Sequence, residues 1–182
     1  MRLLINTRAN SNKARNDNGT TPLFKAAEKG HVEVVRLLIK AGAEINTATT
    51  DDFEAIPLYI AAQGGHDKVA SLLIKAGTQI NRATANYGTA PLFIAAQGGH
   101  VQVVCLLIKA GADMNKSRTD AAGETPLYVA AENGHAEVVR LLIEARVNIL
   151  KSKWACCGSP TAAGGWCWQQ SRQSQFPFFS HS

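Results

Sequence analysis

The apolar positions of the chain recur with a period of 34 to 35 residues. Segment 87–115, YGTAPLFIAAQGGHVQVVCLLIKAGADMN, shows the pattern: a short apolar stretch opens at Pro91, two glycines interrupt it, and a longer apolar run follows. The same order of positions occurs three more times, and the prolines that open the four copies are Pro22, Pro57, Pro91 and Pro126. A fixed period of this length is typical of a repeat array.

Each copy predicts two helices. Pro91 fits the first turn of a helix, because its missing N–H is not needed there and its φ is already set. The pair Gly98–Gly99 ends this first helix, and a second helix with a wide apolar face is expected from about Val101 to Ala110. Gly111 stands where a helix C-terminus favours a left-handed residue. The unit is therefore helix, tight turn, helix and a long polar loop.

The pattern G-x-T-P-L-x-x-A-A-x-x-G-H-x-x-V-V-x-L-L-I-x-A-G-A-x-x-N resembles the ankyrin repeat. Residues 19–46 carry it almost fully, and residues 123–127 carry its opening. The resemblance covers about residues 1–150. It implies an all-α fold, an ankyrin-repeat solenoid of stacked helix-turn-helix units with hairpin-like loops along one edge. It also implies protein binding, since the family has no shared catalytic site.

The spacing divides the chain into a half repeat, a repeat domain and a tail. Residues 2–5 align with residues 36–39, so residues 1–17 are expected to be the second helix of a truncated repeat. Either this half repeat is a trimmed cap, or the chain starts midway through a longer protein. The repeat domain is expected to be 18–150, with repeats at about 18–50, 51–86, 87–120 and 121–150.

The fourth repeat departs from the pattern at its end. Arg146 replaces the glycine that closes the other second helices, and a left-handed conformation there would be strained. Residues 151–182 hold all three tryptophans and no Leu, Ile or Val, so they cannot be a fifth repeat. We expect an irregular, largely disordered tail. Two interpretations stay open. Either a tryptophan or two of the tail covers the last repeat, or the tail is not a selected sequence and results from translation past a splice or frame boundary.

Two substitutions within the repeats affect packing. Thr21 is a plausible N-cap, whereas Ile56 and Ala90 replace the capping threonine, so the middle repeats are expected to depend on packing against their neighbours.

The histidine that the family usually has two residues after the proline is replaced by an aromatic residue in every copy. We interpret these rings as packing between repeats, with a ligand-stacking stripe as the alternative; they are Phe24, Tyr59, Phe93 and Tyr128.

No constellation of catalytic or metal-binding residues emerges. The repeat histidines, one per copy, would lie about 8–10 Å apart in stacked helices, whereas zinc ligands all lie ~2.0–2.3 Å from one metal. The tail cysteines lack C-x-x-C spacing, and the glycine pairs follow a helix and not a strand, unlike a phosphate loop. We therefore expect no enzyme, no cofactor and no metal.

The charge distribution bears on partners and location. The net charge is +5, yet all 14 acidic residues precede residue 151, so part of the excess lies in the tail and does not argue for nucleic acid. The start is too short for a signal peptide, and no apolar run approaches the ~20 residues of a membrane span. We expect an intracellular, cytoplasmic monomer with no membrane partner.

The first functional hypothesis is a scaffold or adaptor that binds a protein partner on its concave face and loop tips. Phe53 and Tyr87, on adjacent loops, are the expected hot spot. The candidate partner-binding residues are Glu28, Lys29, Asp51, Asp52, Phe53, Gln63, Asn86, Tyr87, Gln97, Arg118, Asp120, Glu132 and Asn133. The alternative is a targeting fragment of a larger protein, such as an enzyme whose catalytic domain is not in this chain.

Overall fold

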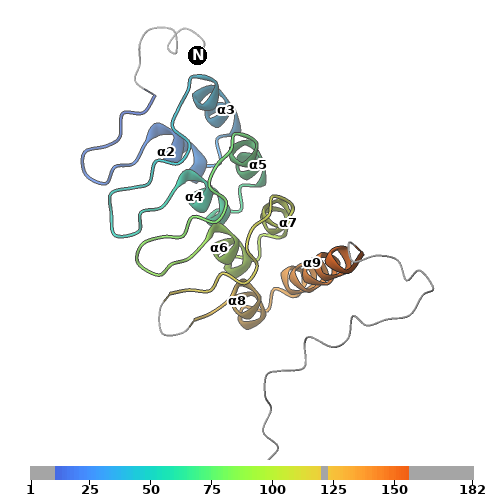
Figure 1. The fold of residues 1–182 in the computed structure, drawn as a ribbon. Coiled ribbons are helices and arrows are strands. Elements are labelled where there is room, and N and C mark those ends of the chain that lie inside the picture. Colours follow the sequence, from blue (N-terminus) through green and yellow to red (C-terminus); the bar gives the residue numbers. More distant parts are fainter. Residues whose placement is uncertain (1–10, 120–122, 156–182) are drawn as a thin grey trace, which may run out of the picture. The chain divides into compact units, whose positions relative to one another are not determined.

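The computed structural model describes residues 11–119 and 123–155, with side chains up to residue 146. All regular elements of these residues are helices, which confirms the all-α prediction (Figure 1). The first helices of the repeats are α2 (Pro22–Glu28), α4 (Pro57–Gln63), α6 (Pro91–Gln97) and α8 (Pro126–Glu132). The second helices are α3 (Val32–Lys40), α5 (Asp67–Lys75), α7 (Val101–Lys109) and α9 (Ala136–Ala155).

The helices stack in two rows. Helices α2, α4, α6 and α8 contact one another in sequence, and α3, α5 and α7 form the second row beside them (Figure 1). The core is a strip along the stack: Leu23, Leu58 and Leu92 are at most 1% exposed. Each of these side chains is covered by its own repeat and the next one, so burial of apolar surface is shared between neighbours. The predicted solenoid is confirmed.

Capping differs between the outer and the middle repeats, as the sequence predicts. The Thr21 hydroxyl accepts a hydrogen bond from the Phe24 amide at 3.2 Å, and Thr125 caps α8 in the same way. Ile56 and Ala90 offer no such bond at the starts of α4 and α6. Both side chains are instead buried, at 1% and 3% exposure. The middle repeats thus replace a cap with contacts to their neighbours.

The repeat histidines join successive repeats. In each case Nε2–H donates to the carbonyl of the last residue in the preceding first helix. The pairs are His66 with Glu28 at 3.0 Å, His100 with Gln63 at 2.9 Å, and His135 with Gln97 at 2.9 Å. A carbonyl at a helix C-terminus has no partner within its own helix, so each histidine satisfies a group that would otherwise need water.

The loops are joined by a second set of bonds. The Thr50 amide donates to the Asn18 carbonyl, the Ala85 amide to Phe53 and the Thr119 amide to Tyr87, at 2.9 to 3.0 Å. Each loop also closes on itself, for example through the bond from the Thr84 amide to the Thr89 carbonyl. These bonds hold the hairpin-like loops in register along one edge of the stack (Figure 1).

One loop position shows how neighbouring repeats adjust to each other. Gly88 has φ +64°, and a Cβ there would overlap the side chain of Thr119. In the second repeat the same position holds Glu54, with φ +47°. The residue opposite, placed by the loop-to-loop bonds, is Ala85 instead of threonine. The smaller partner makes room for a side chain that costs roughly 1–2 kcal/mol in this conformation.

The end of the fourth repeat differs from the prediction. We expected its second helix to stop, with Arg146 strained in the glycine position and the repeat ending at about residue 150. Helix α9 instead continues through this position to Ala155. Without glycine or proline, continuing the helix leaves backbone groups bonded within it and avoids the left-handed residue altogether. Residues 1–10 of the half repeat and 156–182 of the tail lie outside the described residues.

The loop geometry predicts the effect of adding a methyl group at residue 88. Gly88→Ala is expected to lower the free energy of unfolding by about 2–3 kcal/mol, from left-handed strain and overlap with Thr119. Gly88→Ala/Thr119→Ala should recover about 1 kcal/mol, because it reproduces the pairing at Glu54 and Ala85. Urea denaturation of the single and double variants measures this coupling. Equal stabilities of the two variants would contradict it.

The capping pattern predicts a stabilising substitution. Ala90→Thr is expected to raise the free energy of unfolding by about 1 kcal/mol, because the new hydroxyl can accept from the amide of Phe93 as Thr21 does from Phe24. Thr21→Ala is the converse control and should lose a similar amount. Thermal and urea unfolding of the two variants give the result. A destabilised Ala90→Thr would show that burial at this position excludes the hydroxyl.

Candidate functional site

Two exposed aromatic rings meet on the loops of the second and third repeats. Phe53 is 45% exposed and Tyr87 is 46% exposed. Their ring centroids lie 6.5 Å apart at an interplanar angle of 65°, which is an edge-to-face contact. The bond from the Ala85 amide to the Phe53 carbonyl fixes the two loops against each other. The sequence placed these rings on adjacent loops, and the structure brings them into contact.

Arg118, near the end of the third repeat, extends this pair towards the fourth. Its guanidinium carbon lies 5.1 Å from the Tyr87 ring centroid and 5.9 Å from that of Phe93. Its Nη1 donates to Glu124 Oε2 at 3.2 Å, and both side chains are only about one-fifth exposed. We name Phe53, Tyr87 and Arg118 the aromatic–arginine cluster. The cluster presents the apolar surface of two rings, together with the Arg118 guanidinium, which is already paired with the Glu124 carboxylate.

A hollow of about 210 Å³ lies beside Phe53. Three aromatic side chains and one carboxylate contribute to its lining, which comprises Phe24, Thr49, Asp51, Phe53, Ala55, Tyr59, Ile60 and Gln63. Asp51 Oδ1 accepts from the Thr49 hydroxyl at 2.6 Å and from the Phe53 amide at 3.2 Å. The Tyr59 hydroxyl is hydrogen-bonded to Thr89 at 3.3 Å. These bonds hold the walls of the hollow in place.

The sequence analysis did not assign Phe24, Tyr59 or Glu124 to a site. The first two carry the aromatic side chain that replaces the family's histidine, and we interpreted them as packing. Both are buried, at 8% and 6% exposure, so that interpretation describes them, but they also line the hollow. The sequence does mark Glu124 as unusual for its position in the repeat. It stands where the other repeats have Thr or Ala, in the same loop as Arg118.

The other predicted residues stand either in the loops or at the C-terminal ends of the first helices. Side chains of Lys29, Asp52, Asn86 and Glu132 are exposed, as are those of Gln63 and Gln97, whose carbonyls accept from the histidines. Asn133 instead caps α8, because its Nδ2 donates to the Val129 carbonyl at 2.8 Å. Asp120 lies outside the described residues.

Glu28 is the predicted residue whose ionisation is most clearly affected. Its carboxylate accepts a hydrogen bond from the Lys25 ammonium at 2.5 Å, and this bond lowers the pKa of Glu28 from its usual value. Lys29 approaches the same carboxylate at 3.9 Å. Lys25 and Lys29 therefore share one carboxylate, and Glu28 offsets only part of their charge.

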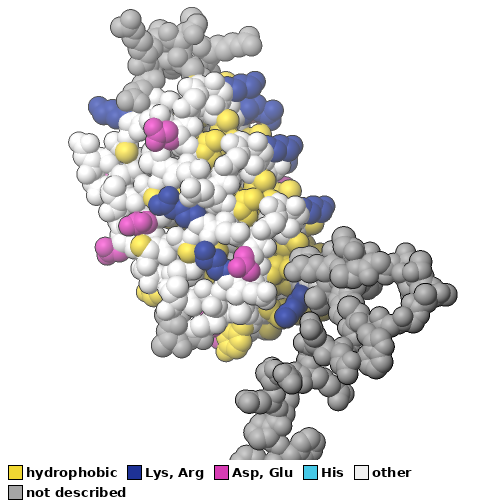
Figure 2. All heavy atoms as spheres, in the orientation of Figure 1, with side chains coloured by type: hydrophobic (Ala, Val, Ile, Leu, Met, Phe, Trp, Pro, Cys, Tyr) yellow, Lys and Arg dark blue, Asp and Glu magenta, His cyan; other side chains and the backbone are white. Residues whose placement is uncertain are grey.

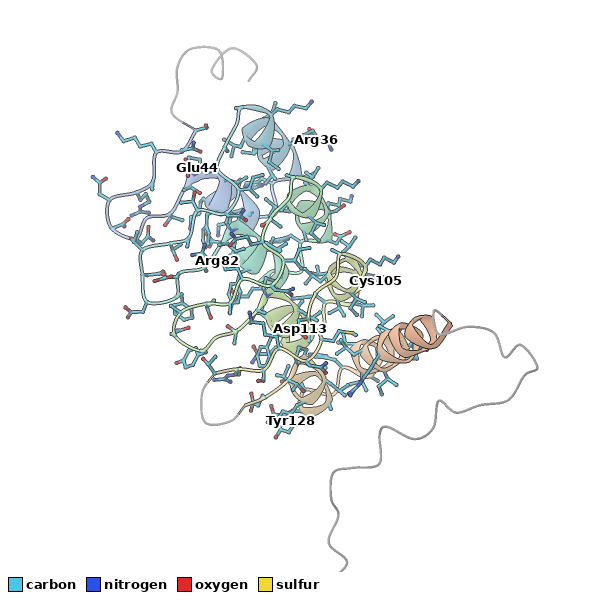
Figure 3. All side chains as sticks on the ribbon, in the orientation of Figure 1. Arg36, Glu44, Arg82, Cys105, Asp113 and Tyr128 are labelled. Carbon is cyan, nitrogen blue, oxygen red and sulfur yellow. The ribbon has the colours of Figure 1, made fainter. Side chains whose placement is uncertain are left out.

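The fourth aromatic ring behaves differently from its equivalents. Tyr128 is 55% exposed and projects from α8 on the side away from α6 (Figure 3). The prediction that all four rings pack between repeats therefore holds for Phe24, Tyr59 and Phe93 and is wrong for Tyr128. The reason is positional: each of the first three rings has a following repeat to cover it, and the described residues contain no helix pair after α8 and α9.

A second hollow, of about 300 Å³, lies on the row of second helices. Figure 2 shows apolar side chains over α3, α5 and α7, bordered by lysines and arginines. The lining residues are Val32, Arg36, Asp67, Lys68, Ser71, Leu72 and Leu106. The hollow holds both charges and apolar groups, without aromatic rings.

The described part of the chain offers neither a cluster of metal ligands nor a membrane-spanning helix. Residues 11–119 and 123–155 bring no three His, Cys, Asp or Glu side chains together in a way that could hold a metal ion. Over the same residues, every helix is too short or too polar to cross a membrane.

Comparison with known families follows the repeat boundaries. A model described as ankyrin repeats (3 copies) matches residues 1–49 and 46–118. A model described as ankyrin repeat matches residues 122–152. A search of curated proteins found no match.

The arginine at the end of the cluster is expected to contribute to stability. Arg118→Gln should lower the free energy of unfolding by about 1–2 kcal/mol, because it removes an ion pair at a partly buried position and the contacts with two rings. Arg140→Gln is the control, since the Arg140–Glu137 pair is exposed and worth little. Urea denaturation compares the two variants. Equal losses would contradict a special role for Arg118.

Proposed function

The chain belongs to the ankyrin repeat family, and we propose that it is a scaffold or adaptor that binds a protein partner through the aromatic–arginine cluster and the neighbouring loop tips. Ankyrin repeats generally mediate protein–protein interactions and are typically non-catalytic. The proposal adds where on this chain the partner binds. We also propose that the protein is a monomer and acts in the cytoplasm.

The exposed contact between Phe53 and Tyr87 carries the proposal. The described residues bury most of their large apolar side chains, and the large ones left exposed are Phe53, Tyr87, Tyr128 and Ile143. Two of these four touch each other at exposed positions of adjacent loops. Clustered aromatic residues and arginine dominate the energetics of many protein interfaces, since they combine a large apolar area with directional polar groups.

The loops that hold the cluster are organised before any partner arrives. Asp51 closes its own loop through the Thr49 hydroxyl and the Phe53 amide, and Arg118 is held by Glu124. Backbone bonds then tie each loop to the next. A surface ordered in advance loses less conformational entropy on binding, so more of the contact energy contributes to affinity.

The alternative role uses the same surface. If the chain is part of a longer protein, the array would recruit a partner or substrate for a domain elsewhere in that protein. The cluster would then serve as the targeting element, and its contribution to binding would be measured in the same way.

The proposal predicts that the cluster determines partner binding. Phe53→Ala/Tyr87→Ala is expected to weaken binding at least tenfold, because it removes two hot-spot side chains, each worth over about 1 kcal/mol. Stability should change by less than about 1 kcal/mol, because both rings are about half exposed. Affinity capture from a native lysate would identify partners by mass spectrometry, and calorimetry would then give Kd values for the native chain and the variant.

Tyr128→Ala is the matched control, since this ring is equally exposed but lies outside the cluster. It should leave the partner's Kd unchanged. If the double variant binds as well as the native chain, or if Tyr128→Ala weakens binding equally, the cluster is not the binding surface.

A further inference from the structure

The loop that leads into the fourth repeat holds an arginine at the position equivalent to Thr49, which lines the hollow beside Phe53. Arg118 corresponds to Thr49, and Phe93 corresponds to Phe24, because both pairs have the same offset as Pro57 and Pro126. The loop-closing bonds confirm the register: the amides of Thr49 and Arg118 donate to the equivalent carbonyls of Ala55 and Glu124. The Arg118 guanidinium lies 5.9 Å from the Phe93 ring centroid.

In the loop that leads into the second repeat, the shorter side chain of Thr49 leaves this space open. The hollow of about 210 Å³ adjoins Phe24, which is 8% exposed, whereas Phe93 beneath Arg118 is 1% exposed. A water molecule takes roughly 30 Å³ of liquid, so the hollow has room for a long side chain. The space that Arg118 fills in one repeat is thus available to a ligand two repeats earlier.

The charges around the hollow favour a cation. Asp51 lines it, and among the described residues no ion pair involves this carboxylate. Asp52 and Glu54 add two more acidic groups to the same loop, and Glu54 has Arg82 at 4.0 Å. The nearest lysines of the first repeat, Lys25 and Lys29, are both engaged by Glu28.

We propose that this hollow binds one arginine side chain from an extended segment of the protein partner. The guanidinium lies against the Phe24 ring and donates to the Asp51 carboxylate, as Arg118 lies against Phe93 and donates to Glu124. Arginine fits better than lysine because its planar group can stack on a ring and pair with a carboxylate at the same time. The remainder of the segment lies over Phe53 and Tyr87.

The inference rests on the proposed function and adds the chemistry of the partner. The cluster supplies apolar contact area, which many sequences can use. The hollow supplies one charged position beside it, which selects a partner residue and sets the register of the segment along the loops. A partner lacking arginine at that position would leave the Asp51 carboxylate partly desolvated and unpaired, which disfavours binding.

A peptide selection with the full chain tests the inference. Random displayed nonapeptides are selected on the native chain, and the best is synthesised with arginine and with citrulline, which keeps the shape and removes the charge. We expect arginine at one fixed position. Citrulline should weaken binding to the native chain by at least about tenfold, as expected for the loss of a charge-assisted hydrogen bond.

Two neighbouring aspartates provide the matched variants. Asp51→Asn keeps the oxygen that accepts from Thr49 and the Phe53 amide, but removes the charge that faces the hollow. It should weaken the arginine peptide about tenfold and reduce the difference between arginine and citrulline to about twofold or less. Asp52→Asn, next to it and outside the hollow, should behave as the native chain. Thermal unfolding of both variants establishes that the fold is retained.

A second variant pair fills the hollow from within. The double variant Thr49→Arg/Ala55→Glu copies the Arg118–Glu124 pair into the loop before α4 and should abolish binding of the arginine peptide.

The inference is overturned if the selected peptides lack a fixed arginine, if a peptide with lysine at that position binds equally well, or if Asp52→Asn acts like Asp51→Asn. Peptides that do not need arginine but are lost on Phe53→Ala/Tyr87→Ala would overturn the inference and support the proposed function. Retention of no peptide would count against both.

Discussion

Each helix pair in this protein can bury its apolar face only against the pairs on either side, and the rest of the structure follows from that constraint. Leu23, Leu58 and Leu92 of the first three first helices are fully buried because a neighbour covers them, whereas Leu127 of α8 is only partly buried. The same neighbour supplies the histidine that bonds to the last carbonyl of α2, α4 and α6. Contacts between repeats therefore stabilise each repeat as well as joining it to the next, and a missing cap at Ile56 or Ala90 can be tolerated.

The same constraint makes substitutions in one repeat depend on residues in the next or in the same loop. Glu54 occupies a glycine position, and the residue opposite it is alanine where the other loops have threonine. Arg118 replaces a short side chain, and Glu124 appears beside it to hold the guanidinium. Such pairs change the surface of the loops while the helices keep their packing. Such differences between repeats can therefore alter the loop edge without altering the helix packing.

These differences give a repetitive scaffold a surface that does not repeat. Two exposed rings meet on adjacent loops, an arginine closes one end of the cluster, and a hollow with a carboxylate lies at the other. Under the proposed function, this order of apolar, cationic and acidic positions would fix both the direction and the register of a bound segment. A surface of four identical loops would offer several equivalent registers and so less specificity.

The sequence alone determined the number of repeats, the two helices in each, the caps and the exposure of Phe53 and Tyr87, because all of these depend on local spacing and on side-chain type. It did not determine that helix α9 continues through Arg146, since a left-handed helix end and a longer helix compete there and the pattern described only the first. Nor did it show that Tyr128 would be exposed when Phe24, Tyr59 and Phe93 are covered. The contact of Arg118 with two rings and the hollow at Thr49 also emerged only in the folded chain. They join side chains from different repeats, and distances between repeats are set by packing and not by sequence spacing.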